Sequence, residues 1–252
     1  MEPYSKSTLN IINILKLSYE LYFHSFKKCL IYISLISSYY ILLVLVSNTH
    51  FNSIETINIS IIALKILIIP LVGGFYYYQN NVLKKEIDLY QAILYGFNKT
   101  IPLVMSIIYI SFIPLIICIS CVFAKLTLGQ SYPIINNYII GLALILCSLI
   151  LGNKVLTPII VMVENLDTID SYKKNNELSK HYYFQYLILG YIPFAIELLP
   201  FLYVTSINWL YKNTTLLKFA IYHITAYLLI IMVVPLTSAI KLTFYNKLKS
   251  LK

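Results

Sequence analysis

The chain contains no arginine, and all 19 of its basic residues are lysines. Arginine makes the bidentate contacts that grip phosphates and base edges, so its absence argues against a nucleic-acid partner. Charged residues of either sign make up 12% of the 252 residues, whereas a soluble domain carries about a quarter. This leaves too little polar surface to cover a globule of this size. The 59% hydrophobic content excludes intrinsic disorder.

Cysteine is also scarce, with four residues: Cys29, Cys118, Cys121 and Cys147. All lie in or beside apolar runs, where a free thiol behaves as a small hydrophobe, so we expect unpaired, packed cysteines. The C-x-x-C at Cys118 and Cys121 has no second ligand pair to complete a metal site. The sequence also has no catalytic triad order, glycine-rich phosphate loop or zinc spacing. We therefore expect no enzyme activity, no metal and no cofactor.

Long apolar runs dominate the sequence. A helix that crosses a bilayer needs about 20 mostly apolar residues. Six runs approach or exceed that length and predict one transmembrane domain over residues 1–252: about 29–46, 58–78, 101–123, 138–163, 186–206 and 219–240. The fourth run is long, and Gly152 and Pro158 mark where it can break. No cleavage site follows the first run, so we expect it to stay in the mature protein.

The lysines predict the orientation of these spans. Fourteen lie before residue 29 or in segments 79–100, 164–185 and 241–252, and three lie in the connections on the opposite side. Because positive residues stay on the cytoplasmic side of short loops, we expect both termini in the cytoplasm. Abundant Lys, Asn, Ile and Tyr without Arg suggest a bacterium with A/T-rich codons. The expected location is its inner membrane.

A short polar helix is predicted before each pair of spans. Residues 7–26 carry an apolar stripe through Ile12, Leu15, Tyr19 and Phe26, which is typical of a helix lying on the inner leaflet. The alternative is a helix packed on the bundle. Segments 86–99 and 168–180 resemble this one in layout. The predicted fold is therefore all-α, with about six transmembrane helices in three hairpins, each preceded by an amphipathic interfacial helix.

The most polar passage is VENLDTIDSYKKNNELSKHYYFQY, at residues 163–186. The acids Asp167 and Asp170 share one helical face, where a carboxylate pair can act as acid and base or bind a cation. A capped helix explains them without chemistry, because acids are stabilised at a helix N-terminus. Lysines in the next turns suit anionic headgroups. The candidate headgroup contacts are Lys27, Lys28, Lys173, Lys174 and Lys180.

Two charged residues lie inside predicted spans at similar depth, Lys65 and Glu197. Charges inside a span are costly and usually face the interior and pair, so they are a candidate intramembrane polar pair. In the alternative, Lys65 extends to the membrane surface alone, while Glu197 is protonated and hydrogen-bonds a hydroxyl such as that of Tyr203 or Thr205.

Three short motifs resemble the YciC-like family of bacterial inner-membrane proteins. They are Pro158-Ile-Ile-Val-Met-Val-Glu164, Ile169-Asp-Ser-Tyr-Lys-Lys and Leu178-Ser-Lys. In that family a helix containing a proline and ending in an acidic residue leads to a short amphipathic helix and then to the next span. The resemblance implies a location and a shape but no reaction.

These observations predict a multi-pass inner-membrane protein with a non-enzymatic role in membrane or envelope homeostasis. Its expected partners are the bilayer and anionic headgroups. The alternative is a transporter or channel for a small solute or lipid, which requires polar residues facing one another within the membrane.

Overall fold

The described part of the chain is almost wholly helical and contains no strand. The structure is a computed structural model, and it describes residues 10–48, 54–82, 87–128, 143, 146–147, 150–152, 154–193, 195–196 and 216–251. Its complete helices are α1 (Ile11–Asn48), α2 (Ile54–Asn81), α3 (Leu89–Asn98), α4 (Thr100–Leu128), α6 (Thr157–Glu164), α7 (Thr168–His181) and α9 (Leu216–Ser250). The all-α prediction is confirmed for these residues.

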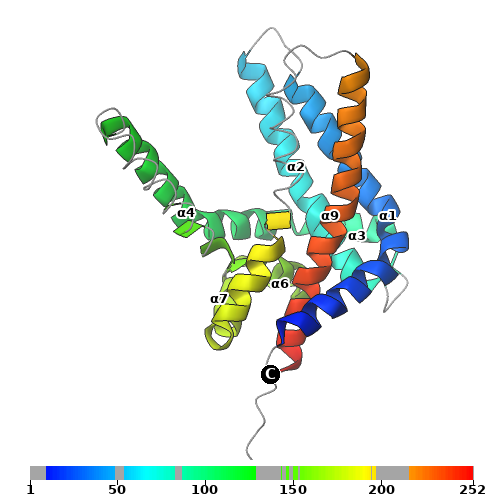
Figure 1. The fold of residues 1–252 in the computed structure, drawn as a ribbon, viewed down its shortest axis with the longest axis vertical. Coiled ribbons are helices and arrows are strands. Elements are labelled where there is room, and N and C mark those ends of the chain that lie inside the picture. The colour runs from blue at the N-terminus through cyan, green and yellow to red at the C-terminus, as the bar shows by residue number, and fades with distance from the viewer. Residues whose placement is uncertain are drawn as a thin grey trace, which may run out of the picture.

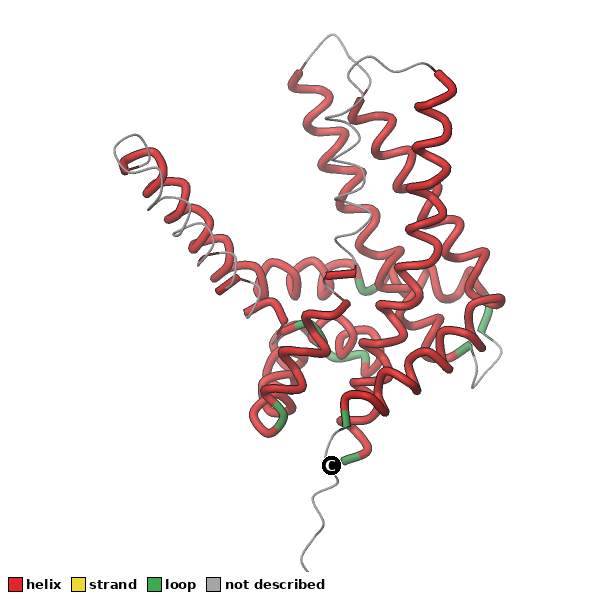
Figure 2. Tube along the Cα trace, in the orientation of Figure 1, coloured by secondary structure: helices red, strands yellow, loops and turns green. Residues whose placement is uncertain are grey.

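Helices α1, α2 and α9 form an upright bundle (Figure 1), and α4 projects away from it. Figure 2 shows the same arrangement along the chain trace. A buried glutamine joins all three helices of the bundle, because the Gln79 side-chain nitrogen donates to Ser25 Oγ at 3.3 Å and to the Pro235 carbonyl at 3.0 Å. A wholly buried amide needs such partners to offset its lost hydration.

Helix α1 is one continuous helix of 38 residues. The sequence predicted a surface helix over 7–26 and a separate span from residue 29. In the structure both belong to α1, whose N-terminal part runs obliquely across the foot of α9 (Figure 1). Ile14 is buried against α9, while Ile12, Tyr19 and Phe23 are exposed. The described part of this segment therefore packs on the bundle along one face, as in the alternative interpretation, and keeps an apolar outer face.

The two other short helices each begin after an aspartate cap: α7 begins at residue 168 as predicted, and α3 begins at Leu89, three residues after the predicted start at 86. Asp88 accepts from the Tyr90 amide before α3, and Asp167 accepts from the Asp170 amide at 2.8 Å before α7. Such caps satisfy amides that the first helical turn leaves unpaired. The capped-helix interpretation of Asp167 and Asp170 is confirmed. The two aspartates of this segment differ in position, because Asp167 is the cap and Asp170 lies inside the first turn of α7.

Glycines bring helix backbones into direct contact. A methyl group added at Gly96 of α3 would meet the Pro70 carbonyl and lie 2.8 Å from the Gly74 amide nitrogen of α2. One added at Gly190 would lie 3.0 Å from the Gly152 Cα. Gly74 therefore allows α2 and α3 to pack closely. The four cysteines are free, as predicted, but Cys118 is exposed on α4 rather than packed.

The fourth predicted span is interrupted. The described residues between 143 and 154 are helical, a turn follows at Val155 and Leu156, and α6 begins at Thr157 with Pro158 in its first turn. Proline suits this position because its missing amide would be unpaired there anyway. The expected break between Gly152 and Pro158 is confirmed. Most of the connections at 48–57, 124–137 and 207–218, and much of the predicted span at 186–206, lie outside the described residues.

Two of the described helices are long and apolar enough to cross a membrane. They contain Thr100–Cys121 on α4 and Ile224–Ser250 on α9. These agree with the predicted third and sixth spans.

Candidate functional site

The first candidate site is a cluster of charged side chains around Glu164, at the end of α6. Lys174 of α7 and the Tyr245 hydroxyl of α9 each donate to its carboxylate, and the Lys249 ammonium lies 3.1 Å from it. The Glu164 side chain is 11% exposed. Three helices therefore meet on one carboxylate, which we call the Glu164 cluster.

The chain turn after α6 sets up this arrangement. Asn165 has a left-handed backbone with a φ of 58°, which asparagine tolerates better than most residues and which ends a helix. The chain then reverses into α7, so that Lys174 returns to Glu164 ten residues earlier. Tyr95 of α3 fixes the same turn, because its hydroxyl donates to the Met162 carbonyl at 3.2 Å and lies 3.4 Å from Asn165 Oδ1.

The environment of Glu164 holds its carboxylate ionised. Burial acts to raise its pKa, but hydrogen bonds from Lys174, Tyr245 and Lys249 and the charge of Lys174 outweigh burial and lower the pKa from 4.5 to about 2. A carboxylate that is permanently charged and already holds three donors is poorly suited to proton transfer near neutral pH. The contacts of Glu164 therefore join α6, α7 and α9 through one carboxylate.

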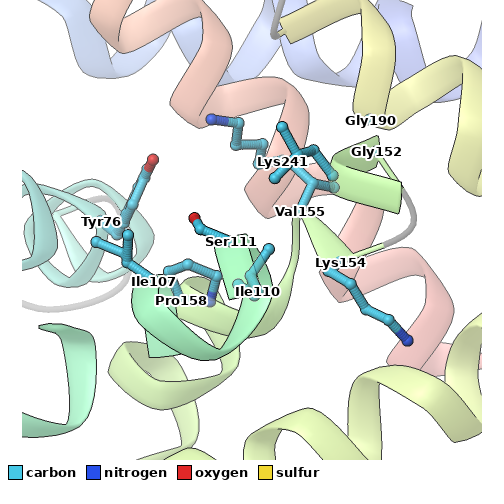
Figure 3. Close-up of a pocket in the computed structure, with 11 residues that line it drawn as sticks. Tyr76, Ile107, Ile110, Ser111, Gly152, Lys154, Val155, Pro158, Gly190 and Lys241 are labelled. Atoms are coloured by element: carbon cyan, nitrogen blue, oxygen red, sulfur yellow. The ribbon is translucent and has the colours of Figure 1, made fainter. Parts of the chain in front are cut away.

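The second candidate site is a pocket between α4, the α6 region and α9 (Figure 3). Its volume is about 210 Å³. The walls are mainly apolar, and the lining residues are Tyr76, Ile107, Ile110, Ser111, Leu151, Gly152, Lys154, Val155, Pro158, Gly190 and Lys241. No acidic residue lines it among those the structure describes.

Lysines occupy two sides of this pocket. Lys241 is only 7% exposed, and its ammonium lies 6.0 Å from the centre of the Tyr76 ring. In Figure 3 the polar ends of Tyr76, Ser111 and Lys241 lie on the same side. Lys154 points away, toward α7, where its ammonium donates to Asn176 and lies 4.5 Å from the centre of the Tyr172 ring.

A second hollow lies on the far side of Lys154. It is lined by Lys154, Asn176, Ser179, Lys180 and Tyr183 and has a volume of about 540 Å³. Lys154 thus lines both the mainly apolar pocket and this second hollow with its polar side chains.

The predicted headgroup lysines occupy different environments. Lys27, Lys28, Lys173 and Lys180 are exposed, and Lys173 pairs loosely with Asp170 at 3.7 Å. Lys174 is instead held in the Glu164 cluster. The pair of Lys65 and Glu197 stays a prediction, because Glu197 and the side chain of Lys65 lie outside the described residues.

Sequence reasoning missed the roles of Tyr245, Lys249 and Lys241. Tyr245 and Lys249 belong to the Glu164 cluster, but Glu164 and Lys174 lie 71 or more positions earlier in the chain. Lys241 carried one available signal, since it is the first charge after the apolar run 219–240. Comparisons of the chain with models of protein families, with curated proteins and with solved structures find no match.

Proposed function

We propose that the chain is a multi-pass protein of a bacterial inner membrane, with both termini in the cytoplasm and a non-enzymatic role in membrane or envelope homeostasis. The observation that carries this proposal is the segregation of charge. The N-terminal part of α1, α7 and the C-terminal end of α9 lie toward one end of the molecule (Figure 1). These segments carry most of the lysines named above, and α4 exposes apolar side chains along its length.

The exposed lysines at that end, Lys27, Lys28, Lys173 and Lys180, are the proposed contacts for anionic headgroups, at about 1 kcal/mol each. The Glu164 cluster supports a structural role for the polar end, because its carboxylate is fully used in joining three helices. The family resemblance agrees with this location and adds no reaction.

Labelling of single cysteines tests the topology. In a background without the four native cysteines, Lys173→Cys should resist an impermeant thiol reagent added to intact cells, because Lys173 is on the proposed cytoplasmic side. Asn213→Cys should react. Labelling at position 173 with none at 213 would overturn the orientation.

A gene deletion tests the proposed role. Deleting the gene in its native host should make the envelope more permeable to a hydrophobic dye. Unchanged permeability, with the protein detected in the wild type, would contradict homeostasis.

The apolar pocket with Lys241 at its side favours one second candidate, transport of a lipid. Vesicles containing the purified chain should then move a fluorescent anionic lipid between leaflets faster than empty vesicles. Equal rates of lipid movement in vesicles with and without the chain would contradict transport and favour the non-transport role.

A further inference from the structure

We propose that Cys118 and Cys147 are the site of a reversible disulfide, which ties α4 to the helical segment before α6. The pairing itself is argued from the structure. The oxidant is argued from the proposed topology, so this part of the inference rests on the proposed function. The inference deepens that function, because it gives the outer half of the molecule a covalent modification that follows redox conditions.

The Cys147 thiol lies beside Cys118 of α4. It donates to the Pro114 carbonyl of α4 at 3.7 Å. In a helix the carbonyl of residue 114 also accepts from the amide of residue 118, so the Cys147 thiol and the Cys118 backbone converge on one oxygen. The two thiols are themselves in hydrogen-bonding contact. Disulfides join cysteines whose Cβ atoms lie about 4 Å apart, so this contact brings the pair close to the geometry of the bond.

A disulfide suits this place better than a metal ion. Within the described part of the chain, no three histidine, cysteine or acidic side chains lie close enough together to hold an ion. Cys147 is only 8% exposed. Two thiolates around a soft monovalent metal carry a net negative charge, which is costly to bury, whereas a disulfide is neutral.

The unequal exposure of the two thiols gives each a role in thiol–disulfide exchange. Cys118 is exposed, and its thiolate attacks an external disulfide, one sulfur of which leaves as a thiolate. The Cys147 thiolate then attacks the Cys118 sulfur of the mixed disulfide and releases the second thiolate. The protons of the two cysteines pass to the two released thiolates. One disulfide therefore forms in the protein as one external disulfide is reduced to two thiols.

The proposed topology supplies the oxidant. Cys118 lies three residues before the end of the apolar run Thr100–Cys121, on the side opposite the cytoplasmic termini. It therefore lies near the outer membrane surface, and the bacterial periplasm on that side is kept oxidising by proteins that carry disulfides. The bond also matters for α4, because only 17% of the most apolar stretch of this helix is buried in the protein.

Oxidised glutathione is the probe for the pairing. The full chain, purified with its four thiols reduced, is incubated with the probe in neutral detergent, alkylated and weighed by mass spectrometry. The wild type should lose two alkylation sites together without retaining glutathione, and the linked peptides should contain residues 118 and 147. Dithiothreitol should restore both thiols. A chain that keeps all four thiols, or that retains glutathione on Cys118, would overturn the site.

Single variants assign the bond to its cysteines. Cys118→Ser changes an exposed side chain and so leaves the fold intact, and it should slow disulfide formation by about tenfold or more. Cys121→Ser is the matched control, because it removes a thiol one turn further along the same helix, and it should oxidise at the wild-type rate. Cys29→Ser removes a buried thiol of α1 and should also have no effect. Equal rates in Cys118→Ser and Cys121→Ser would overturn the assignment to Cys118.

The redox state in cells separates this inference from the proposed topology. Thiols are trapped with a maleimide after acid quenching, and the wild type should carry the bond, which dithiothreitol added to the cells should remove. A chain that forms the bond in detergent but stays reduced in cells, where Lys173→Cys labels from outside, would keep the site and overturn the topology. A chain that fails to form the bond in detergent, while labelling gives the expected topology, would overturn the inference and leave the proposed location standing.

Discussion

Helices α4 and α9 both carry an apolar run long enough to cross a membrane, but they bury very different shares of that run inside the protein. Within Thr100–Cys121 of α4, 17% of the most apolar stretch is buried in the protein, against 61% within Ile224–Ser250 of α9. The less buried run is also the more apolar of the two, with a mean hydropathy of 2.5 in α4 against 1.9 in α9. The difference lies in the partners: α9 packs against α1 and α2, whereas α4 turns outward beyond its first turns (Figure 1).

The two apolar runs are therefore accommodated in different ways in the structure. Helix α9 has Gln79 donating to its backbone and supplies Tyr245 and Lys249 to the Glu164 cluster, so its position is fixed by specific polar contacts. The outer face of α4 carries Met105, Phe112, Ile113, Ile116 and Ile119, all exposed. An apolar face of this extent on a helix is stable only against lipid or another protein.

The largest expected effect comes from placing a charge on the exposed face of α4. Ile113→Asp should cost about 2.5–3.5 kcal/mol of membrane insertion, because aspartate at the centre of a span is that unfavourable. The measurement is the fraction of α4 inserted in a glycosylation-based insertion assay. Ile12→Asp, on the exposed outer face of α1 near its start, is the control, and α4 should insert normally in this variant. Normal insertion of Ile113→Asp would indicate that this face meets water.

The next effect concerns the contact between α2 and α3. Gly96→Ala should lower the free energy of unfolding in detergent by about 1–3 kcal/mol, because its methyl group would overlap the backbone of α2 at Pro70 and Gly74. Gly152→Ala is the matched control, since its nearest neighbours would be at 3.8 and 3.9 Å, an ordinary contact distance. Equal thermal stability of the two variants would mean that α3 does not approach α2 so closely.

A smaller loss is expected when the Glu164 cluster loses its charge. Glu164→Gln should destabilise the protein by about 1–2 kcal/mol, because two ammonium groups lose their carboxylate while partial exposure of Lys249 softens the penalty. Asp170→Asn removes an exposed carboxylate beside Lys173 and should change stability by less than about 0.5 kcal/mol. Chemical unfolding of both variants in the same detergent gives the comparison.

The pH dependence of stability follows from the same carboxylate. The pKa of Glu164 falls from 4.5 to about 2 on folding, so the folded state binds fewer protons between these values. Its contribution is complete above about pH 5 and disappears as the pH falls toward 2. The unfolding midpoint of the wild type should therefore drop more steeply over this window than that of Glu164→Gln. Parallel curves would show that Glu164 is not held ionised.

The smallest effect concerns the cap of α7. Asp167→Ala leaves the Asp170 amide without its acceptor and should cost about 1 kcal/mol of stability. Asp167→Asn keeps an acceptor at the cap and is the control. Thermal unfolding that ranks the asparagine variant below the alanine variant would contradict the capping role.

Local features of the fold were predictable from the sequence because their causes are local. Asp88 and Asp167 stand just before short helices, and Gly152 and Pro158 mark a break that lies between them. The continuity of α1 was not predictable, since Lys27 and Lys28 looked like the end of a surface helix. In the structure both are exposed, and the Lys28 ammonium donates to the Val82 carbonyl, just past the end of α2, at 3.4 Å. Long lysine side chains let a helix cross such a point unbroken.

The candidate sites were only half predictable for a different reason. Glu164 and Lys174 lie in one polar passage, so their importance showed in composition. Tyr245 and Lys241 enter through the packing of α9 against the rest of the chain, which no local pattern encodes. The packing of Gly96 on Gly74 is likewise a contact between two separate helices.

The pairing of α1 with α9 has a consequence for the order of assembly. Ile14 of α1 shares a buried cluster with Ile240, Phe244 and Tyr245 of α9, so the first described helix finds its main partner in the last one. On the ribosome, α1 is complete long before α9 exists. Its inner face must therefore stay covered by α2, lipid or a chaperone until synthesis nears its end. Closing so long a chain into one bundle is slow, and the Glu164 cluster, which also needs α9, can form only in that final step.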